Sequence, residues 1–461
     1  MNQQPNPFHA MHRATSRRSF LGLGLAATAG LATASCSSDG NDTTDGGVTG
    51  DVVFWHPYGQ ETRQAELQVA FDIFEEEHPG ARVQAEYVPF GDLPLRWPAA
   101  QQGGTLPDLM INIPENILPM HIAGVIDTDA LGSLVEELGG EPFFAPGFLD
   151  KNGRYQGDTF AIPHYAHNRL MLYRSDRLAA AGLEVPETLA DVEECAAAMN
   201  NPPDFFGWTM PLSQNDIGGG YLLWMITRSN GGSLVDPEGN QFWASDEVRA
   251  AADYLGRIAS QYGPTSAATT AIGDTFNRFH DGTASMVVDT AANIAVANST
   301  EGLDPELVAS LNGTHIPAGT QPGHMVGSVA MTIPVDANVA AAHELAKVLY
   351  RPEVHLDFLL SIPMFHFPAT TNIDTDAFFG EPLIAQYKDT VVAQTLAGID
   401  EGSVAGFEDG PNPFIGPILD AKISEVMIQD IAFGGMGVDA ALEKAAAAAD
   451  EIVARIQSQI S

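Results

Sequence analysis

The stretch Asp51-Val-Val-Phe-Trp-His56 is short and rich in β-branched and aromatic residues, which predicts a β-strand. In the segment after it, apolar residues from Leu67 to Phe74 recur at i, i+3, i+4 and i+7, the spacing that lines one face of a helix. His78-Pro79-Gly80 then ends that helix, because proline and glycine do not continue it. The sequence therefore predicts a strand followed by a helix that packs through its apolar face.

The same alternation continues along the chain. Arg82–Val88 is predicted as a strand, Gly91–Gln102 as a helix, and Asp108-Leu-Met-Ile-Asn-Ile113 as an apolar strand closed by Pro114. Strands that alternate with helices favour an α/β fold in which a mainly parallel sheet is covered by helices. Ligands of such sheets bind at the carboxyl ends of the strands, so the loops after His56 and Ile113 are candidate binding loops.

A second α/β unit is expected further along. Its predicted strands are Thr159–Pro163, Arg169–Tyr173 and Met286–Asp289, and its first predicted helix is Ala190–Met199. Two alanine-rich helices are predicted at 341–350 and 439–460, each with apolar residues on one face.

The first 35 residues have the composition of an export signal. They contain Arg13, Arg17 and Arg18 but no acidic residue, followed by an apolar stretch of about 15 residues that is too short to span a bilayer. Ser16-Arg17-Arg18-Ser19-Phe20-Leu21 resembles a twin-arginine export motif, and Thr33-Ala34-Ser35-Cys36 resembles a lipoprotein processing site. We expect residues 1–35 to be removed and Cys36 to carry a lipid anchor on the outer face of the membrane, or the chain to be secreted or periplasmic if Cys36 is not acylated.

Residues 36–50 are mostly Ser, Asp, Asn, Thr and Gly, a composition that predicts a flexible tether. No later apolar run is long enough for a membrane helix, so a globular body is expected to follow the tether.

Composition excludes several classes of function. The chain has 21 basic and 59 acidic residues, a net charge of −38 that opposes binding to nucleic acid. Its two cysteines suit neither a disulfide framework nor a cysteine-rich metal centre, and no nucleotide-binding or nucleophile-elbow motif occurs in the body. We therefore expect no cofactor and no metal. The acidic surface is consistent with adaptation to high salt or simply with solubility.

Eight segments in fixed order resemble the solute-binding proteins of ABC importers, in particular the family that includes the maltose and multiple-sugar binders. They are 53–56 with 74–80, 104–109, 155–163, 172–176, 181–183, 230–234, 279–286 and 346–353. The resemblance implies two α/β lobes joined by crossings near His167, Val326 and Thr371, with solute bound between the lobes. Lobe 1 would comprise residues 51–165 and 327–370, and lobe 2 residues 166–326 and 371–461.

This resemblance implies a monomeric receptor that captures a small solute and delivers it to separate permease and ATPase chains, without enzymatic activity. A sugar or polyol is the expected solute, because flat aromatic rings can stack on C–H groups and planar polar groups can bind hydroxyls. The candidate ligand-binding residues are Trp55, His56, Tyr58, Glu115, Asn116, His164, Tyr165, Asn168, Trp208, Trp224, Asp289, Asn293, Ser328, Phe365 and His366.

Structural roles remain open for several of these residues. Trp55, Trp224 and Phe365 are also compatible with core packing, and Asn116 with a helix cap. His164 and His167 have the spacing of a metal pair, but nothing completes the site, so hydrogen-bonding roles are favoured. The alternatives at the level of function are an exported carbohydrate-active enzyme, which needs two facing carboxyl groups, and a receptor for a polyamine or a phosphorylated solute.

Overall fold

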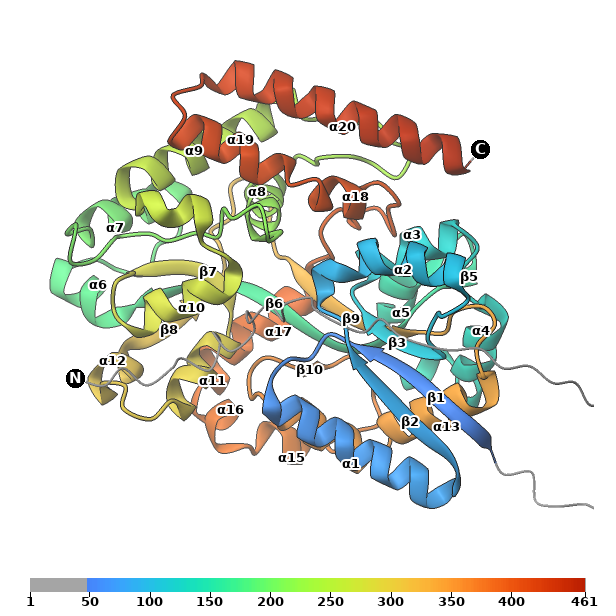
Figure 1. Cartoon of the computed structure of the whole chain (residues 1–461). Coiled ribbons are helices and arrows are strands. Elements are labelled where there is room, and N and C mark those ends of the chain that lie inside the picture. Colours follow the sequence, from blue (N-terminus) through green and yellow to red (C-terminus); the bar gives the residue numbers. More distant parts are fainter. Residues whose placement is uncertain (1–47, 461) are drawn as a thin grey trace, which may run out of the picture. The chain divides into compact units, whose positions relative to one another are not determined.

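The computed structural model describes residues 48–460, so the predicted leader, Cys36 and most of the tether lie outside the described residues. β1 (Thr49–His56) pairs in parallel with β2 (Gly80–Tyr87) and with β3 (Leu109–Asn112). α1 (Glu61–Glu77) and α2 (Leu93–Gly103) connect these strands, which confirms the predicted β-α-β-α-β order (Figure 1). β1 begins at Thr49, so it includes the last two residues of the predicted tether.

The sheet continues on the other side of β3 with antiparallel strands. β9 (Val326–Thr332) pairs with β3, β6 (Ile162–Arg174) pairs with β9, and β10 (Phe367–Pro368) closes the order β10-β6-β9-β3-β1-β2. The strands that pair in parallel are therefore those predicted from the first 113 residues. The strands that join them arrive from distant parts of the chain and run the opposite way.

β6 belongs to two sets of strands. Residues from Ile162 to Asn168 pair with β9, whereas residues from Arg169 to Arg174 pair with β7 (Met286–Thr290) and β8 (Leu311–Thr314), both antiparallel. A single strand of 13 residues thus connects the two halves of the fold, as Figure 1 shows.

The predicted strand at 169–173 is confirmed as part of β6, but the predicted strand at 159–163 and the break between the two were wrong. Asp158–Thr159 forms the short strand β5, which pairs with β4 (Arg154–Tyr155), and the segment from Ile162 to Arg174 is one continuous strand. The residues predicted as a crossing between lobes are extended because β9 satisfies their backbone hydrogen bonds.

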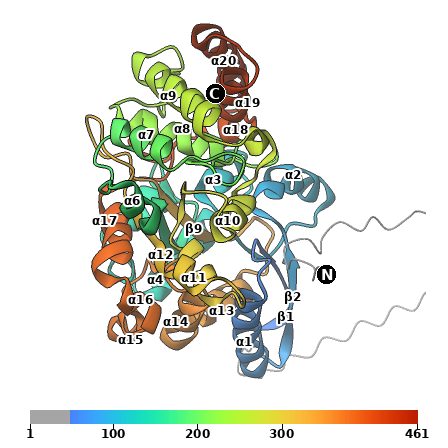
Figure 2. The same cartoon turned by 90° about the vertical axis from the view of Figure 1, so that its left-hand side faces the viewer.

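Helices cover both faces of the first set of strands. The apolar stripe of α1 is buried as predicted, with Phe71 packed edge-on against Phe54 of β1, and α1 packs on α13 and α14. α3 packs on α2 and β9 (Figure 2). The other elements of this part are η1 (Phe90–Asp92), α3 (Pro114–Ile122), α4 (Thr128–Leu138), η2 (Glu141–Phe143), α5 (Phe148–Gly153), α13 (Val339–Leu349) and α14 (Pro352–Leu360).

The second set of strands is surrounded by the remaining helices, among which α8, α9, α19 and α20 pack together. These helices are α6 (Ser175–Ala181), α7 (Leu189–Ala198), α8 (Gly218–Ser229), α9 (Asp246–Tyr262), η3 (Thr265–Thr269), α10 (Ile272–His280), α11 (Ala292–Ser299), α12 (Pro305–Ser310), α15 (Thr375–Phe379), α16 (Pro382–Gln386), the π-helical turn η4 (Lys388–Val392), α17 (Ala393–Glu401), α18 (Ile415–Asp420), α19 (Ile423–Ala432) and α20 (Val438–Ile460). Among residues 48–460, no helix combines the length and the apolar character needed to cross a membrane.

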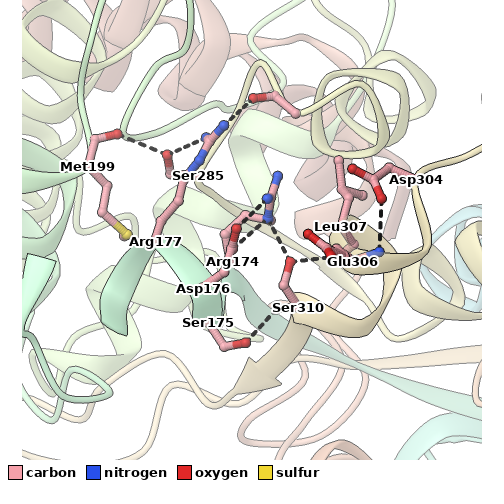
Figure 3. A network of polar contacts seen from close by, with 11 residues as sticks. Arg174, Ser175, Asp176, Arg177, Met199, Ser285, Asp304, Glu306, Leu307 and Ser310 are labelled. Carbon is pink, nitrogen blue, oxygen red and sulfur yellow. Dashed lines mark hydrogen bonds and ion pairs between the residues drawn. The ribbon is translucent and has the colours of Figure 1, made fainter. Parts of the chain in front are cut away.

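A network of charged side chains fixes the far end of β6 (Figure 3). Nε of Arg174 donates to Oδ1 of Asp176 and to Oγ of Ser310, both at 2.8 Å. Nη1 of Arg177 donates to Oγ of Ser285 at 2.8 Å. The bonds of Arg174 tie β6 to α6 and α12, and the bond of Arg177 ties α6 to the residue preceding β7, so the strand has a rigid anchor on the side away from its middle.

Candidate functional site

Alternation along β6 divides the side chains near its middle between two faces. Tyr165, His167 and Arg169 share one face, and Asn168 lies on the other. Gly327, directly opposite His167 on β9, lies so close to the His167 ring that any side chain at 327 would overlap it. On the other face, a side chain at Gly398 of α17 would overlap Asn168. The face that carries His167 is the one on which the candidate site is built.

An aromatic cluster occupies the first part of this face. The ring of Tyr165 is 4.4 Å from that of His366 and 6.4 Å from that of Tyr58, measured between centroids. The ring of His167 lies 4.9 Å from that of Phe365. The structure therefore brings together the predicted residues Tyr58, Tyr165, Phe365 and His366, which come from three distant segments of the chain.

The loop after β1 positions Tyr58. The backbone N–H of Tyr58 donates to Nδ1 of His56 at 3.3 Å, and the two rings stack at 5.9 Å. Gln64 of α1 donates from Nε2 to the carbonyl oxygen of Tyr58 at 3.0 Å. Burial lowers the pKa of His56 to about 4, so its ring is neutral at neutral pH and available as an acceptor.

Arg63 places a positive charge beside the cluster. Its guanidinium lies 5.0 Å from the Tyr58 ring centroid and 5.4 Å from that of Phe365, and the residue is only 6% exposed. Within residues 48–460 no carboxylate forms an ion pair with Arg63, and its Nε has no hydrogen-bond partner. The neighbouring groups stay uncharged near neutral pH, because burial raises the pKa of Tyr58, lowers that of His366, and lowers that of His167 to about 3.

A buried ion pair lies further along the same face. Nη1 of Arg169 is 3.3 Å from Oδ1 of Asp289, which also accepts from the backbone N–H of Thr290, and Oδ2 accepts from the hydroxyl of Thr275. Burial raises the pKa of Asp289 to about 6, and the nearby Arg169 limits that rise. At pH 7 Asp289 is therefore mostly ionised and compensates the charge of Arg169.

Tyr221 connects this ion pair to Glu115. The Arg169 guanidinium lies 5.1 Å from the Tyr221 ring centroid, and burial followed by the nearby Glu115 carboxyl raises the pKa of Tyr221. Glu115 lies in the first turn of α3 and is 4% exposed; burial raises its pKa to about 8. Gly416 of α18 lies directly against the carbonyl oxygen of Glu115. Residues predicted for the two lobes thus meet at this point.

Five predicted residues are placed differently. His164 stacks on His355 at 4.9 Å, and Asn168 and Ser328 lie on the α17 face of the sheet. The amide of Asn116 donates to Phe90 O and to Asn112 Oδ1 rather than capping its helix. The ring of Trp55 is covered by the Arg96 guanidinium at 4.3 Å.

Three further candidates lie within the second half of the fold. Trp224 donates from Nε1 to Oε2 of Glu408 at 3.2 Å. The backbone N–H of Trp208 donates a hydrogen bond to the carbonyl oxygen of Tyr262. The backbone carbonyl oxygen of Asn293 accepts a hydrogen bond from Nε2 of His280. None of these contacts includes a residue of the aromatic cluster.

The prediction omitted four residues of this face, Arg63, His167, Arg169 and Tyr221. Two signals could have found them. Arg63 lies four residues before Leu67, on the buried stripe of α1, where a charged residue is unusual. Tyr165, His167 and Arg169 are every second residue of one strand, so their side chains share a face. A prediction that places Tyr165 in the site therefore also places His167 and Arg169 there.

A cavity of about 390 Å³ lies on the opposite face of β6 and β9. Val326, Ile399 and Phe407 provide apolar lining, and Arg228 and Glu408 provide charges. Val326 faces the same side as Asn168, its partner on β6, so this cavity is separated from the aromatic cluster by the strands themselves. In the described part of the chain, no group of three or more His, Cys, Asp or Glu side chains is arranged to hold a metal ion.

The site brings together flat aromatic surfaces, a neutral imidazole, an Arg–Asp pair and a buried carboxyl group with a raised pKa at the junction of two halves of an α/β fold. This combination is typical of proteins that enclose a small solute. A family model for bacterial extracellular solute-binding proteins matches residues 58–355, from Tyr58 of the aromatic cluster to the His355 that stacks on His164. The chain belongs to this family.

Individual relatives are distant. YcjN of Escherichia coli, a periplasmic-binding protein assigned to an ABC transporter, is 24% identical over 239 residues, which are 51% of this chain and 54% of YcjN. The chain thus spans about half the length of this relative. A solute-binding protein of Agrobacterium radiobacter, solved with ribitol, superposes with a TM-score of 0.74 at 20% identity, covering 88% of this chain and all of that one. One from Thermotoga lettingae, solved with α-D-tagatose, gives 0.73 at 17% identity, with the same coverage of both chains. These likenesses show a two-lobed fold.

Proposed function

We propose that the protein is an extracytoplasmic receptor that encloses a carbohydrate or polyol at the face of β6 and delivers it to the permease of an ABC importer. The observation that carries this proposal is the convergence of Tyr58, Tyr165, His167 and Arg169 at the junction between the two halves of the fold. Aromatic rings can cover the C–H face of a sugar, and the Arg169–Asp289 pair can bind neighbouring hydroxyls. Ribitol and tagatose, the solutes of two structural relatives, belong to this chemical class.

The experiment that tests this proposal is a thermal-shift screen of the chain from residue 37 onward. The panel contains monosaccharides, oligosaccharides, polyols, polyamines and sugar phosphates. A solute at 100 times its dissociation constant stabilises the folded state by about 2.7 kcal/mol, which shifts Tm by several degrees. A shift with a sugar or polyol that is recovered unchanged supports the receptor, and a response only to polyamines or phosphates contradicts the proposed solute class.

The same screen separates a receptor from an enzyme. A glycoside hydrolase needs two carboxyl groups on either side of one bond, and Glu115 and Asp289 are the acids of this site. Mass spectrometry of the recovered solute distinguishes the two functions, because a hydrolase releases a smaller product. Cleavage that is lost in both Glu115→Gln and Asp289→Asn would replace the receptor with a carbohydrate-active enzyme.

The division into lobes belongs to this proposal. Lobe 1 comprises 51–165 and 327–370, and lobe 2 comprises 166–326 and 371–461. The change of partners along β6 between Asn168 and Arg169, and the start of β9 at Val326, support the first two crossings. Rotation about these strands would open the face that carries His167 and release the solute.

We further propose that the mature chain is a monomer anchored by lipid on Cys36. The twin-arginine motif at Arg17-Arg18, the processing site before Cys36 and the polar segment that follows support this location. Mass spectrometry of the mature N-terminus from membranes tests it. A diacylglyceryl-modified Cys36 is expected, whereas an unmodified N-terminus in the soluble fraction would exclude the anchor.

A further inference from the structure

The two arginines on the site face are compensated differently. Arg169 forms an ion pair with Asp289, whereas Arg63 has no carboxylate partner among residues 48–460. Arg63 is 6% exposed, and the side chain of Arg169 is 10% exposed. A buried charge without a counterion is expensive, and proteins usually pair it. The position of Arg63 therefore requires an explanation beyond the cation–π contacts with Tyr58 and Phe365.

The groups around Arg63 cannot supply the missing charge. Arg63 acts electrostatically on five polar neighbours, which are Tyr58, Tyr87, Tyr165, His167 and His366. Burial raises the pKa of the three tyrosines and lowers the pKa of the two histidines, so all five side chains are neutral near pH 7. The aromatic cluster with Arg63 therefore carries a net charge of one positive unit.

Resting on the proposed function, we propose that the solute is an acidic sugar or sugar acid, a uronate or aldonate, whose carboxylate pairs with Arg63 while its hydroxyls bind near Arg169 and Asp289. A guanidinium presents two parallel N–H donors that match a carboxylate, and the Nε of Arg63 is a buried donor without a hydrogen-bond partner. The guanidinium carbon lies 5.0 Å from the Tyr58 ring centroid and 5.4 Å from that of Phe365, and neither ring neutralises its charge.

A carboxylate suits this site better than a phosphate. A phosphate ester carries about 1.5 to 2 negative charges at pH 7 and is usually bound by several cations. Here Arg63 is the one buried guanidinium of the site face in the described chain without a carboxylate, because Arg169 is already paired with Asp289. A single negative charge therefore balances the site.

Matched solutes test the proposal directly. Calorimetry on the chain from residue 37 compares glucuronate with glucose, galacturonate with galactose, and gluconate with sorbitol, so that each pair differs at one carbon. Glucose 6-phosphate is the phosphorylated probe. We expect an acidic member to bind at least about 30-fold more tightly than its neutral partner, because removing one member of a buried charge pair costs that much or more.

Three variants assign this preference to Arg63. Arg63→Gln should abolish the preference for the acidic member, and Arg63→Lys should retain part of it. Arg82→Gln is the matched control, because its side chain is 59% exposed and remote from the cluster; it should bind like the wild-type chain. Urea unfolding of each variant verifies that it folds, and the charge-retaining Lys variant supplies the answer if Arg63→Gln does not fold.

The outcomes separate the two proposals. A neutral sugar or polyol that binds as well as its acidic partner overturns the carboxylate proposal and leaves the receptor intact. Tighter binding of the phosphate ester also overturns it. If no member of this panel binds, the carboxylate proposal fails, and the thermal-shift screen decides whether the receptor proposal stands. A preference for the acid that survives in Arg63→Gln shows that Arg63 is only a packing residue.

Discussion

Single residues of this site differ in how their charges are balanced. Asp289 compensates Arg169 from a position that is 2% exposed, and it also binds Thr275 and the backbone of Thr290. Asp289→Asn keeps the shape of the side chain but leaves Arg169 buried without a counterion. We expect the free energy of unfolding at pH 7.5 to fall, but by less than the roughly 3 kcal/mol that breaking a buried pair costs, because burial already disfavours the ionised Asp289 and raises its pKa.

Urea unfolding of the unliganded chain measures this loss. Asp253→Asn is the control, because Asp253 is 53% exposed and its pair with Arg257 lies on a helix surface. That variant should stay within about 0.5 kcal/mol of wild type. Equal stability of Asp289→Asn and wild type would show that Arg169 does not depend on Asp289.

The buried carboxyl group of Glu115 should make the free energy of unfolding depend on pH. Burial raises its pKa to about 8, so the folded state keeps a proton that the unfolded state releases above its ordinary pKa. This contribution to stability is fully present below the ordinary pKa and is lost as pH rises toward 8. The Glu115→Gln variant has no ionisable group at this position, so its stability does not show this loss as pH rises. The difference in unfolding free energy, variant minus wild type, should therefore increase by at least about 2 kcal/mol between pH 5 and pH 8.

Taking a difference between two proteins removes the contribution of the buried histidines, which is the same in both. Their lowered pKa values act in the opposite direction, because the unfolded state alone gains protons as pH falls below 6.5. The exposed Glu61→Gln serves as control and should give a difference that does not vary with pH. A flat difference for Glu115→Gln as well would mean that Glu115 is ionised in the folded protein.

The residues of the site were only partly predictable from the sequence. Tyr58 follows β1 and Asp289 lies near the end of β7, so the strand-end argument places them near the site without knowledge of their partners. The contact of Trp224 with Glu408 joins residues that are 184 positions apart, so no local pattern distinguishes Trp224 as a stacking wall from Trp224 as a bonded core residue. Asn168 was assigned to the site although it is adjacent to His167, and adjacent residues of a strand face opposite sides.

At the scale of elements, β6 shows what periodicity can and cannot predict. The apolar runs at its two ends were recognised as strands, but the polar residues from His164 to Asn168 interrupt the pattern and suggested a connection. The structure pairs them with β9 and β10, and these pairings depend on strands more than 150 residues away. The first five elements, in contrast, were predicted correctly because neighbouring parts of the chain pair with one another.

The contact between α18 and α3 carries a prediction about closure. Gly416 approaches the carbonyl oxygen of Glu115 so closely that an added Cβ would overlap it. If α18 and α3 belong to different lobes, Gly416→Ala should keep the lobes apart, weaken binding of the identified solute at least about tenfold and leave the stability of the free protein nearly unchanged.

Calorimetry and small-angle X-ray scattering test this together. The solute should reduce the radius of gyration of wild type but not of Gly416→Ala. Gly132→Ala is the matched control, because a Cβ at that helical position has no neighbour within 4 Å. Equal affinity and equal compaction in Gly416→Ala would show that closure does not require the contact of α18 with α3.

The large negative net charge of the whole chain should make its thermal stability depend on ionic strength. With 59 acidic and 21 basic residues, repulsion between carboxylates destabilises the compact state at low ionic strength. Added salt shortens the screening length from about 10 Å at 0.1 M to about 3 Å at 1 M, so most of this repulsion should disappear within that range. We expect Tm to rise by several degrees between 0.1 and 1 M KCl and to level off above 1 M.

Tetramethylammonium chloride should give the same rise, because screening depends on ionic strength and not on the identity of the cation. A rise with KCl alone would indicate a specific cation site instead, and a Tm that is flat or falls would show that the acidic surface serves solubility without weakening the fold.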